Sequence, residues 1–351
     1  MTELVYTTVE TVSNALDITE TATQGPQILR AIAGATSAVY GITKRFFFPA
    51  HTTVKFDWPN RQTAETWRCW FYANDLWSLT AVTAGGVSIP TANIILEPNW
   101  EGPPYTSAQI DLSTGSSFSA GNTFQQALAF TGLWGKLGEV DQVATLTAAI
   151  TTTTATTLTA TGSAALGVGA TIGIDDEILA ITGKQSAATS VTLSAPGLTA
   201  DEAVTLIPVS STTGFAIGET ITLGAERMQI TDITSGLVVR RAVQGSVLAT
   251  HTTGDTVYAS RLWTVARGLQ GSVAATHLNN APITRYYAPT LVENYTIAHA
   301  MHTLQQEKSA YMTLSRSGPE GGSKAVTSAG LERLKDDLYG TFGRQARTRV
   351  V

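Results

Sequence analysis

The sequence is poor in charged residues, which make up 14% of its 351 positions, against about 25% in an ordinary globular protein. Threonine, alanine, serine and glycine take their place, and hydrophobic residues still reach 43%, enough to bury a substantial core. The single cysteine, Cys69, cannot form an internal disulfide, so nothing points to an oxidising compartment. We expect its thiol to be buried and unreactive. A chain with so little charge is expected to cover part of its surface in an assembly.

Long hydrophobic runs are also missing. No stretch approaches the roughly 18 apolar residues of a membrane-spanning helix, so we expect no membrane association. The segment Met1–Leu4 lacks the charged and apolar parts of a secretory leader, and none is predicted. The net charge of -5 argues against a protein that coats DNA by neutralising phosphates. It is compatible with an acidic wall past which DNA moves.

Motifs for catalysis and ligand binding are missing too. There is no nucleophile elbow and no evident acid/base pair of carboxylates. His299 and His302 are three residues apart near Glu307, but a zinc site needs further ligands, and we expect a polar helix face. The run 175–177 is acidic but lacks the spacing of a calcium loop, which favours a solvated strand end. Residues 318–324 lack the glycine that precedes the lysine of a phosphate loop. The sequence therefore predicts no catalytic, cofactor or metal site, and no enzyme.

Three regions of different texture are present, and together they predict an α+β protein. Residues 1–136 combine a helix with short strands, and residues 137–287 alternate apolar and polar side chains as strands do. Residues 288–351 return to helix and end in a basic tail. In the first region, apolar spacing predicts a helix from Gln27 that ends at Gly41. The strand-like runs of this region are 46–48, 52–58, 66–72, 76–83, 94–96 and 127–134.

Two internal repeats lie in the middle region. Residues 171–182 recur as 220–231, 49 positions on, and residues 239–251 recur as 265–277 with nine of thirteen identical. His251 and His277 are equivalent in the second repeat, so we expect both to be structural and to hydrogen-bond within a turn. The repeats predict duplicated small β units that form an inserted all-β module, either a sandwich or barrel-like.

The last region contains two helical segments and a basic end. The first, 291–316, has an apolar stripe, and the second, 331–338, is expected to stop at Gly340. The tail from Thr341 carries Arg344, Arg347 and Arg349 and no acid. Neither helical end has a complete core of its own. We therefore expect residues 1–136 and 288–351 to fold together, with residues 137–287 inserted between them.

Tryptophans are concentrated in the first region. A base-stacking platform would need interleaved lysine or arginine, and only Arg61 and Arg68 are close to them. The aromatic side chains are better explained as core residues or as anchors of a subunit interface. The four candidates for these two roles are Trp58, Trp77, Trp100 and Trp134.

Six short segments occur in a fixed order outside the middle region. They are 27–39 with its Ala31–Val39 helix, 43–49 (TKRFFFP), 56–59 (FDWP), 74–80 (NDLWSLT), 96–105 with LEPN and GPPY, and 130–135 (FTGLWG). In this order and spacing they resemble the head-to-tail adaptor, or connector, proteins of long-tailed bacteriophages. The resemblance covers residues 1–136 and 289–351, where 291–316 corresponds to the helix that follows the Trp-Gly strand in that family. Residues 137–285 depart from the family.

The resemblance implies a structural role in a virion. Proteins of this family form a ring, commonly of twelve copies, beneath the portal protein, and they are assembled in the host cytoplasm. Their helices surround the channel through which genomic DNA passes without sequence-specific binding. A tail-proximal neck protein, a stopper or tail terminator, is the partner on the other side. On this basis we expect Arg344, Arg347 and Arg349 to lie on an arm that contacts the portal, and the β insert to project outward.

Two alternatives remain open from the sequence. One is another virion structural protein, such as a tail or baseplate component whose β repeats bind carbohydrate. The other is a hydrolase with an unrecognised site, which would need a cleft with perturbed titratable groups.

Overall fold

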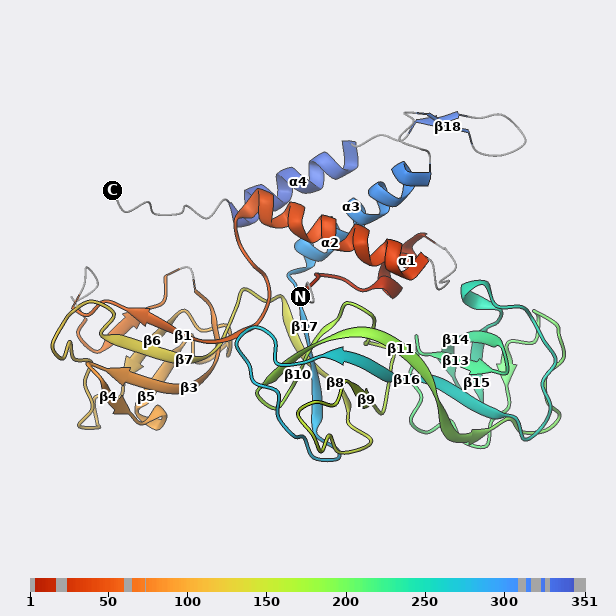
Figure 1. Cartoon of the computed structure of the whole chain (residues 1–351), viewed down its shortest axis with the longest axis horizontal. Helices are drawn as coiled ribbons and strands as arrows, with labels where there is room; N and C mark the ends of the chain where they lie inside the picture. The colour runs from red at the N-terminus through yellow and green to blue at the C-terminus, as the bar shows by residue number, and fades with distance from the viewer. Residues whose placement is uncertain are drawn as a thin grey trace.

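The computed structural model describes residues 4–16, 24–59, 65–72, 74–308, 314–316, 323–325 and 329–343. The chain is α+β, as predicted, and has more strand than helix. Figure 1 shows the helices gathered on one side of a row of three β bodies, the first made by residues 50–134 and the other two by the middle region. No helix among the described residues is long and apolar enough to cross a membrane.

Helices from the two ends of the chain form one bundle. Its members are α1 (Val9–Leu16), α2 (Gln24–Thr43), α3 (Thr290–Lys308) and α4 (Ala329–Phe342). One apolar cluster joins Ile28 and Ile32 of α2 to Leu304 of α3, and a second joins Val39 to Leu338 of α4. Each end of the chain therefore supplies apolar surface that the other end buries.

Helix boundaries differ from the prediction where tertiary packing extends or shortens an element. α2 continues past Gly41 because Thr43 is buried and its hydroxyl donates to the carbonyl of Val39. α4 continues past Gly340, whose surroundings leave open space. α3 stops at Lys308, and residues 314–316 form a strand, β18 (Leu314–Arg316), paired with β19 (Ser323–Ala325). α1 was not predicted; it is short, and the Thr8 hydroxyl caps it by accepting from the Thr11 N–H.

The first β body packs two sheets around an aromatic core. One sheet has the order β1 (Ala50–Phe56), β7 (Leu128–Trp134), β3 (Leu76–Ala84), β4 (Val87–Ile89). The other has the order β2 (Arg68–Trp70), β6 (Ser107–Ile110), β5 (Ile94–Glu97). Phe71 packs edge-on against Phe130 and Trp134 between the sheets. The predicted strand at 46–48 is wrong: this segment links α2 to β1 and inserts Phe47 into the helical bundle.

The middle region contains ten strands in one hydrogen-bonded system. They are β8 (Glu139–Thr145), β9 (Thr157–Thr159), β10 (Thr171–Ile174), β11 (Glu177–Thr192), β12 (Leu206–Ile207), β13 (Thr220–Leu223), β14 (Glu226–Ile233), β15 (Leu237–Arg240), β16 (Thr256–Ala266) and β17 (Pro282–Tyr287). Two separate apolar cores lie among them, one around Ile172 and Trp263 and the other around Ile221 and Met228.

The two cores belong to two copies of one fold. Unit A comprises residues 139–183 and 261–287, and unit B comprises residues 184–260. Ile172 pairs with Leu179 in unit A as Ile221 pairs with Met228 in unit B, in the register of the 49-residue repeat. Isolated bridges, Leu146 with Ala160 after β8 and β9 and Leu193 with Val209 after β11 and β12, join the two edge strands of each unit. Each unit is therefore barrel-like, one of the two forms that the sequence predicted.

Unit B is inserted into unit A at the tip of a hairpin. Within unit B, β14 and β15 are joined by a short turn at residues 234–236. The equivalent strands of unit A are the first half of β11 and the second half of β16, paired through Ile181 and Val265. In place of a turn, these two strands continue into unit B and supply two of its strands. The insertion site leaves both barrels complete because it replaces only a solvent-exposed connection.

Candidate functional site

The repeated sequence motif builds the same buried ionic network in both units. In unit B, Glu226 accepts from Arg241 at 2.9 and 2.7 Å, from His251 Nε2 at 2.9 Å, and from two backbone N–H groups. In unit A, Glu177 accepts from Arg267 at 2.9 and 2.5 Å, from His277 Nε2 at 2.8 Å, and from the equivalent N–H groups. In unit B the network joins the long loop after β15 to the start of β14. In unit A it joins the long loop after β16 to the start of β11.

These carboxylates are saturated with donors. Burial alone would raise the pKa of Glu177, but hydrogen bonds from Arg267, Ala275 and His277 outweigh it and lower the pKa to about 2. The pKa of Glu226 is lowered in the same way, against burial, by Arg241 and His251. A carboxylate that stays ionised and fully hydrogen-bonded is a poor proton acceptor. The networks therefore hold the loops in place and do not form a catalytic dyad.

Two interpretations from the sequence are corrected here. Glu177 was expected at a solvated strand end, whereas it is buried; its neighbour Asp176 is exposed as expected. The two repeat histidines are structural, but His251 and His277 hydrogen-bond to a glutamate on a neighbouring hairpin and not within their own turn. The repeat offsets of 49 and 26 residues in the sequence contain this information, since they align Glu177 with Glu226 and His277 with His251.

Metal ligands do not converge in the part of the chain that the structure describes. No group of three or more histidine, cysteine or acidic side chains there could hold a metal ion. His299 is half-buried on α3, and burial, with the charge of His302, lowers its pKa. Glu307, the third residue of that sequence pattern, pairs instead with Arg30 on α2 at 2.8 Å. Cys69 is buried, as expected, and burial raises the pKa of its thiol to about 12.

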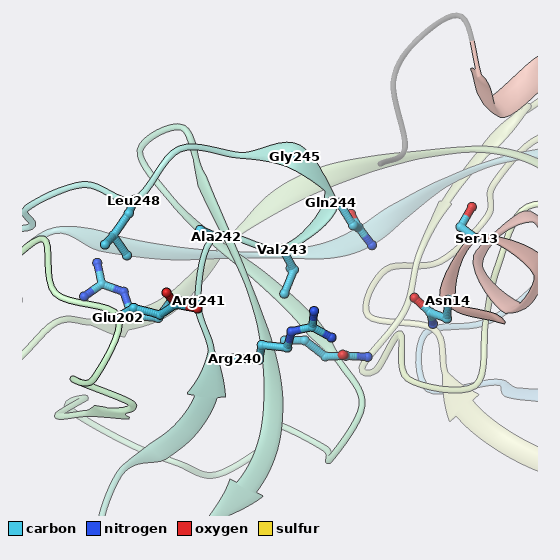
Figure 2. A pocket seen from close by; sticks show the side chains of 11 residues that line it. Ser13, Asn14, Glu202, Arg240, Arg241, Ala242, Val243, Gln244, Gly245 and Leu248 are labelled. Atoms are coloured by element: carbon cyan, nitrogen blue, oxygen red, sulfur yellow. The ribbon is translucent and has the colours of Figure 1, made fainter. Parts of the chain in front are cut away.

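A polar hollow of about 410 Å³ lies between the bundle and unit B. Figure 2 shows Ser13 and Asn14 of α1 across the hollow from Gln244 and Arg240 of unit B. Arg241 also lines it, but its guanidinium is held by Glu226. The hollow brings no nucleophile next to a base, so its lining offers hydrogen bonds and no evident chemistry.

A second hollow, of about 550 Å³, lies on the outer face of the β2-β6-β5 sheet. Its lining includes Arg68, Trp70, Glu97, Glu101 and Ser107. Trp70, Ser107 and Glu97 are directly opposite one another on the three strands, so their side chains share one face. The sequence reasoning missed this face. The signal was the alternation in β2, where Cys69 and Phe71 point inward and Arg68 and Trp70 therefore point outward.

The four aromatic candidates have three different environments. Trp58 and Trp134 are core residues of the first β body. Trp77 is half-buried and donates its indole N–H to the carbonyl of Gly135 at 2.8 Å. Trp100 is 81% exposed, so it is not a core residue and stands as the one candidate of the four for an interface. The structure does not gather these four side chains at one site.

The remaining predicted contact residues, Arg344, Arg347 and Arg349, lie outside the described residues. The described chain ends at Gly343, directly after α4. Phe342, at the end of α4, packs against Phe47 at a ring-centre distance of 5.0 Å. The described part of the chain therefore ends beside the link between the bundle and the first β body.

Large apolar side chains are exposed on separate bodies of the chain. Besides Trp100, they include Phe46 after α2, Val273 and Leu278 in unit A, and Ile217 in unit B. Scattered apolar residues are ordinary on a protein surface, but fully displayed tryptophan is characteristic of interfaces.

No protein-family model matches the sequence, and no curated protein or solved structure matches it either.

Proposed function

We propose that the chain is a structural subunit of a ring, the head-to-tail adaptor of a tailed bacteriophage. The observation that carries this proposal is the helical bundle built from both ends of the chain. α2 packs on α3 through Ile28, Ile32 and Leu304, although Ile32 and Leu304 are more than 250 positions apart in the sequence. Such a bundle is the frame that the resemblance requires once the middle region is treated as an insertion.

Several of the family-like segments occupy key positions in this frame. The Ala31–Val39 run supplies five of the seven buried residues of α2, and residues 43–49 connect the bundle to the first β body. The segment 130–135 forms most of β7, the central strand beside β1 and β3. The segment 96–105 carries Trp100 on the surface. This distribution supports a frame of bundle plus first β body, with units A and B added to it.

A ring of identical copies needs two different faces on each subunit. The exposed apolar side chains fit that need because they lie on different bodies, with Trp100 on the first β body and Ile217 on unit B. In the proposed assembly the ring, of about twelve copies as the family implies, joins the portal protein to a tail-proximal neck protein and encircles the DNA. Its place is the neck of the virion, and it acts on no substrate.

Electron microscopy of the purified full chain, alone and mixed with portal protein, tests this proposal. Rings of uniform size are the expected result. A chain that remains a stable monomer in the presence of portal protein would overturn it.

The portal contact has its own test. Deleting residues 344–351 is expected to abolish portal binding, because it removes Arg344, Arg347 and Arg349 and keeps Phe342, which packs against Phe47 in the bundle. A matched variant that replaces the three arginines by lysine keeps the charge but not the bidentate geometry, and should bind with intermediate strength. Unchanged portal binding by the deletion variant would refute the proposal that the basic tail is an arm that contacts the portal.

A further inference from the structure

We infer that the hollow on the outer face of the β2-β6-β5 sheet is a binding site for a neutral saccharide. No residue of the bundle or of units A and B lines this hollow. Its residues come from one small sheet and the loop that follows β5, so the site is formed within a single chain.

An aromatic ring forms one side of the hollow. Trp70 is 44% exposed, and the guanidinium of Arg68 lies 5.2 Å from its ring centre. Arg68 is paired with Glu65 at 3.1 Å, which helps to hold its guanidinium beside the indole. A sugar ring has an apolar face of C–H groups, and an indole supplies a flat apolar surface of suitable size for stacking.

Polar groups suited to hydroxyls surround the indole. Glu97 stands on the same sheet face. Its Oε2 accepts from the Asn99 N–H at 3.0 Å and its Oε1 from the Gln109 side-chain nitrogen at 3.4 Å, which leaves a further lone pair on each oxygen. Glu101 also lines the hollow. Ser107, between Trp70 and Glu97, is only 1% exposed, yet its hydroxyl has no hydrogen-bond partner among the described residues. A buried hydroxyl without a partner is costly, and a ligand hydroxyl would satisfy it.

The charges of the lining select the class of ligand. Two carboxylates, Glu97 and Glu101, oppose the single guanidinium of Arg68, which is already paired. Phosphate-bearing ligands, including nucleic acids, are disfavoured because the net local charge is negative. A purely apolar ligand would leave these polar groups unsatisfied. A neutral polyhydroxylated ring matches both the indole and the hydrogen-bonding rim, and the volume falls in the range of small-ligand pockets.

This inference differs from the carbohydrate-binding alternative considered from the sequence, which placed binding in the β repeats of residues 137–287. The hollow lies in the first β body and contains no residue of the repeats. It also stands independently of the ring, because a saccharide site could be carried by a ring subunit or by a monomer.

The test is binding of the full-length chain to an array of short neutral oligosaccharides of glucose, galactose, mannose, rhamnose and N-acetylglucosamine, followed by titration of any sugar bound. Trp70→Ala and Glu97→Gln are expected to weaken binding by at least about tenfold, since the first removes the stacking surface and the second replaces a charged acceptor with a neutral amide. Trp100→Ala is the matched control, because it removes an exposed tryptophan that does not line the hollow, and affinity should stay within about twofold.

The outcomes separate this inference from the proposed function. Binding that depends on Trp70 and Glu97 but not on Trp100 supports the saccharide site. No binding to any sugar of the array, or binding unchanged by Trp70→Ala, overturns it. If the unaltered chain binds no sugar and Trp70→Ala disrupts rings, the hollow is a subunit contact, which overturns the saccharide site while the ring stands.

Discussion

The buried network around Glu226 should contribute a large share of the stability of unit B. Glu226 is fully buried and accepts five hydrogen bonds, from Arg241, His251, Ala242 and Ala249. The variant Glu226→Gln keeps the shape but removes the charge, and it turns an amide NH₂ toward donors. The fully buried guanidinium of Arg241 is then left without its counter-charge. Breaking a buried pair in this way costs about 3–5 kcal/mol.

The effect can be measured as a shift in thermal unfolding. At about 2–4 °C for each kcal/mol in a domain of 150–250 residues, the melting temperature of the middle region should fall by about 6–20 °C. Because the chain has several cores, calorimetry should be combined with hydrogen exchange, which would show lost protection in unit B first. Glu139→Gln, at an exposed position of β8, is the control and should change stability by less than about 0.5 kcal/mol.

A second variant distinguishes the network from simple packing. In Glu226→Met combined with Arg241→Met, both charges are gone, and apolar side chains of similar length fill both sites. Replacing a buried pair with apolar groups is often neutral, so much of the lost stability should return. If Glu226→Gln alone lowers the free energy of unfolding by less than about 1 kcal/mol, the network does not contribute a large share of the stability of unit B.

The remaining predictions concern pH, docking and assembly. Glu177 has a pKa of about 2 in the folded chain against 4.5 ordinarily, so its contribution to stability is complete above pH 4.5 and is lost as the pH falls toward 2. Thermal melts across this range should show a melting temperature that falls with pH in the native chain and falls less in Glu177→Gln. Identical pH dependence in the two proteins would contradict the lowered pKa of Glu177. Gly169→Ala should detach the N-terminal segment from unit A, because a Cβ there would lie 2.8 Å from the Val5 side chain. Gly218→Ala, the equivalent change in unit B, is the control: it carries similar positive-φ strain, but its Cβ would meet nothing within 4 Å. Hydrogen exchange at residues 4–16 should therefore rise only in Gly169→Ala, and equal exchange in both variants would count against docking of the N-terminal segment on unit A. Trp100→Asp should leave the melting temperature unchanged and shift the particle mass in light scattering from that of a ring to that of a monomer. If the rings stay intact, Trp100 is not an anchor of the subunit interface.

The sequence determined the elements whose signals are local or repeated. The apolar spacing after Gln27 predicted α2, and alternating residues predicted β1, β3 and β7 close to their observed positions. The repeats predicted two copies of a β unit, because a duplicated sequence encodes the same pleat, turn and core positions twice. Composition also indicated a mixed α+β chain with a β-rich middle, which the structure confirms.

Tertiary contacts decided what the local signals could not. Gly41 and Gly340 favour helix ends, but packing of Thr43 and Phe342 carries both helices past them. Phe46–Phe48 has strand character, yet it pairs with none of the described strands, and Phe47 is buried in the bundle core. The acidic run around Glu177 predicted a surface residue. Glu177 is instead buried, because Arg267 and His277, distant in the sequence, surround it and hydrogen-bond to it. Charge, burial and pairing depend on which distant residues meet, and that depends on the whole fold.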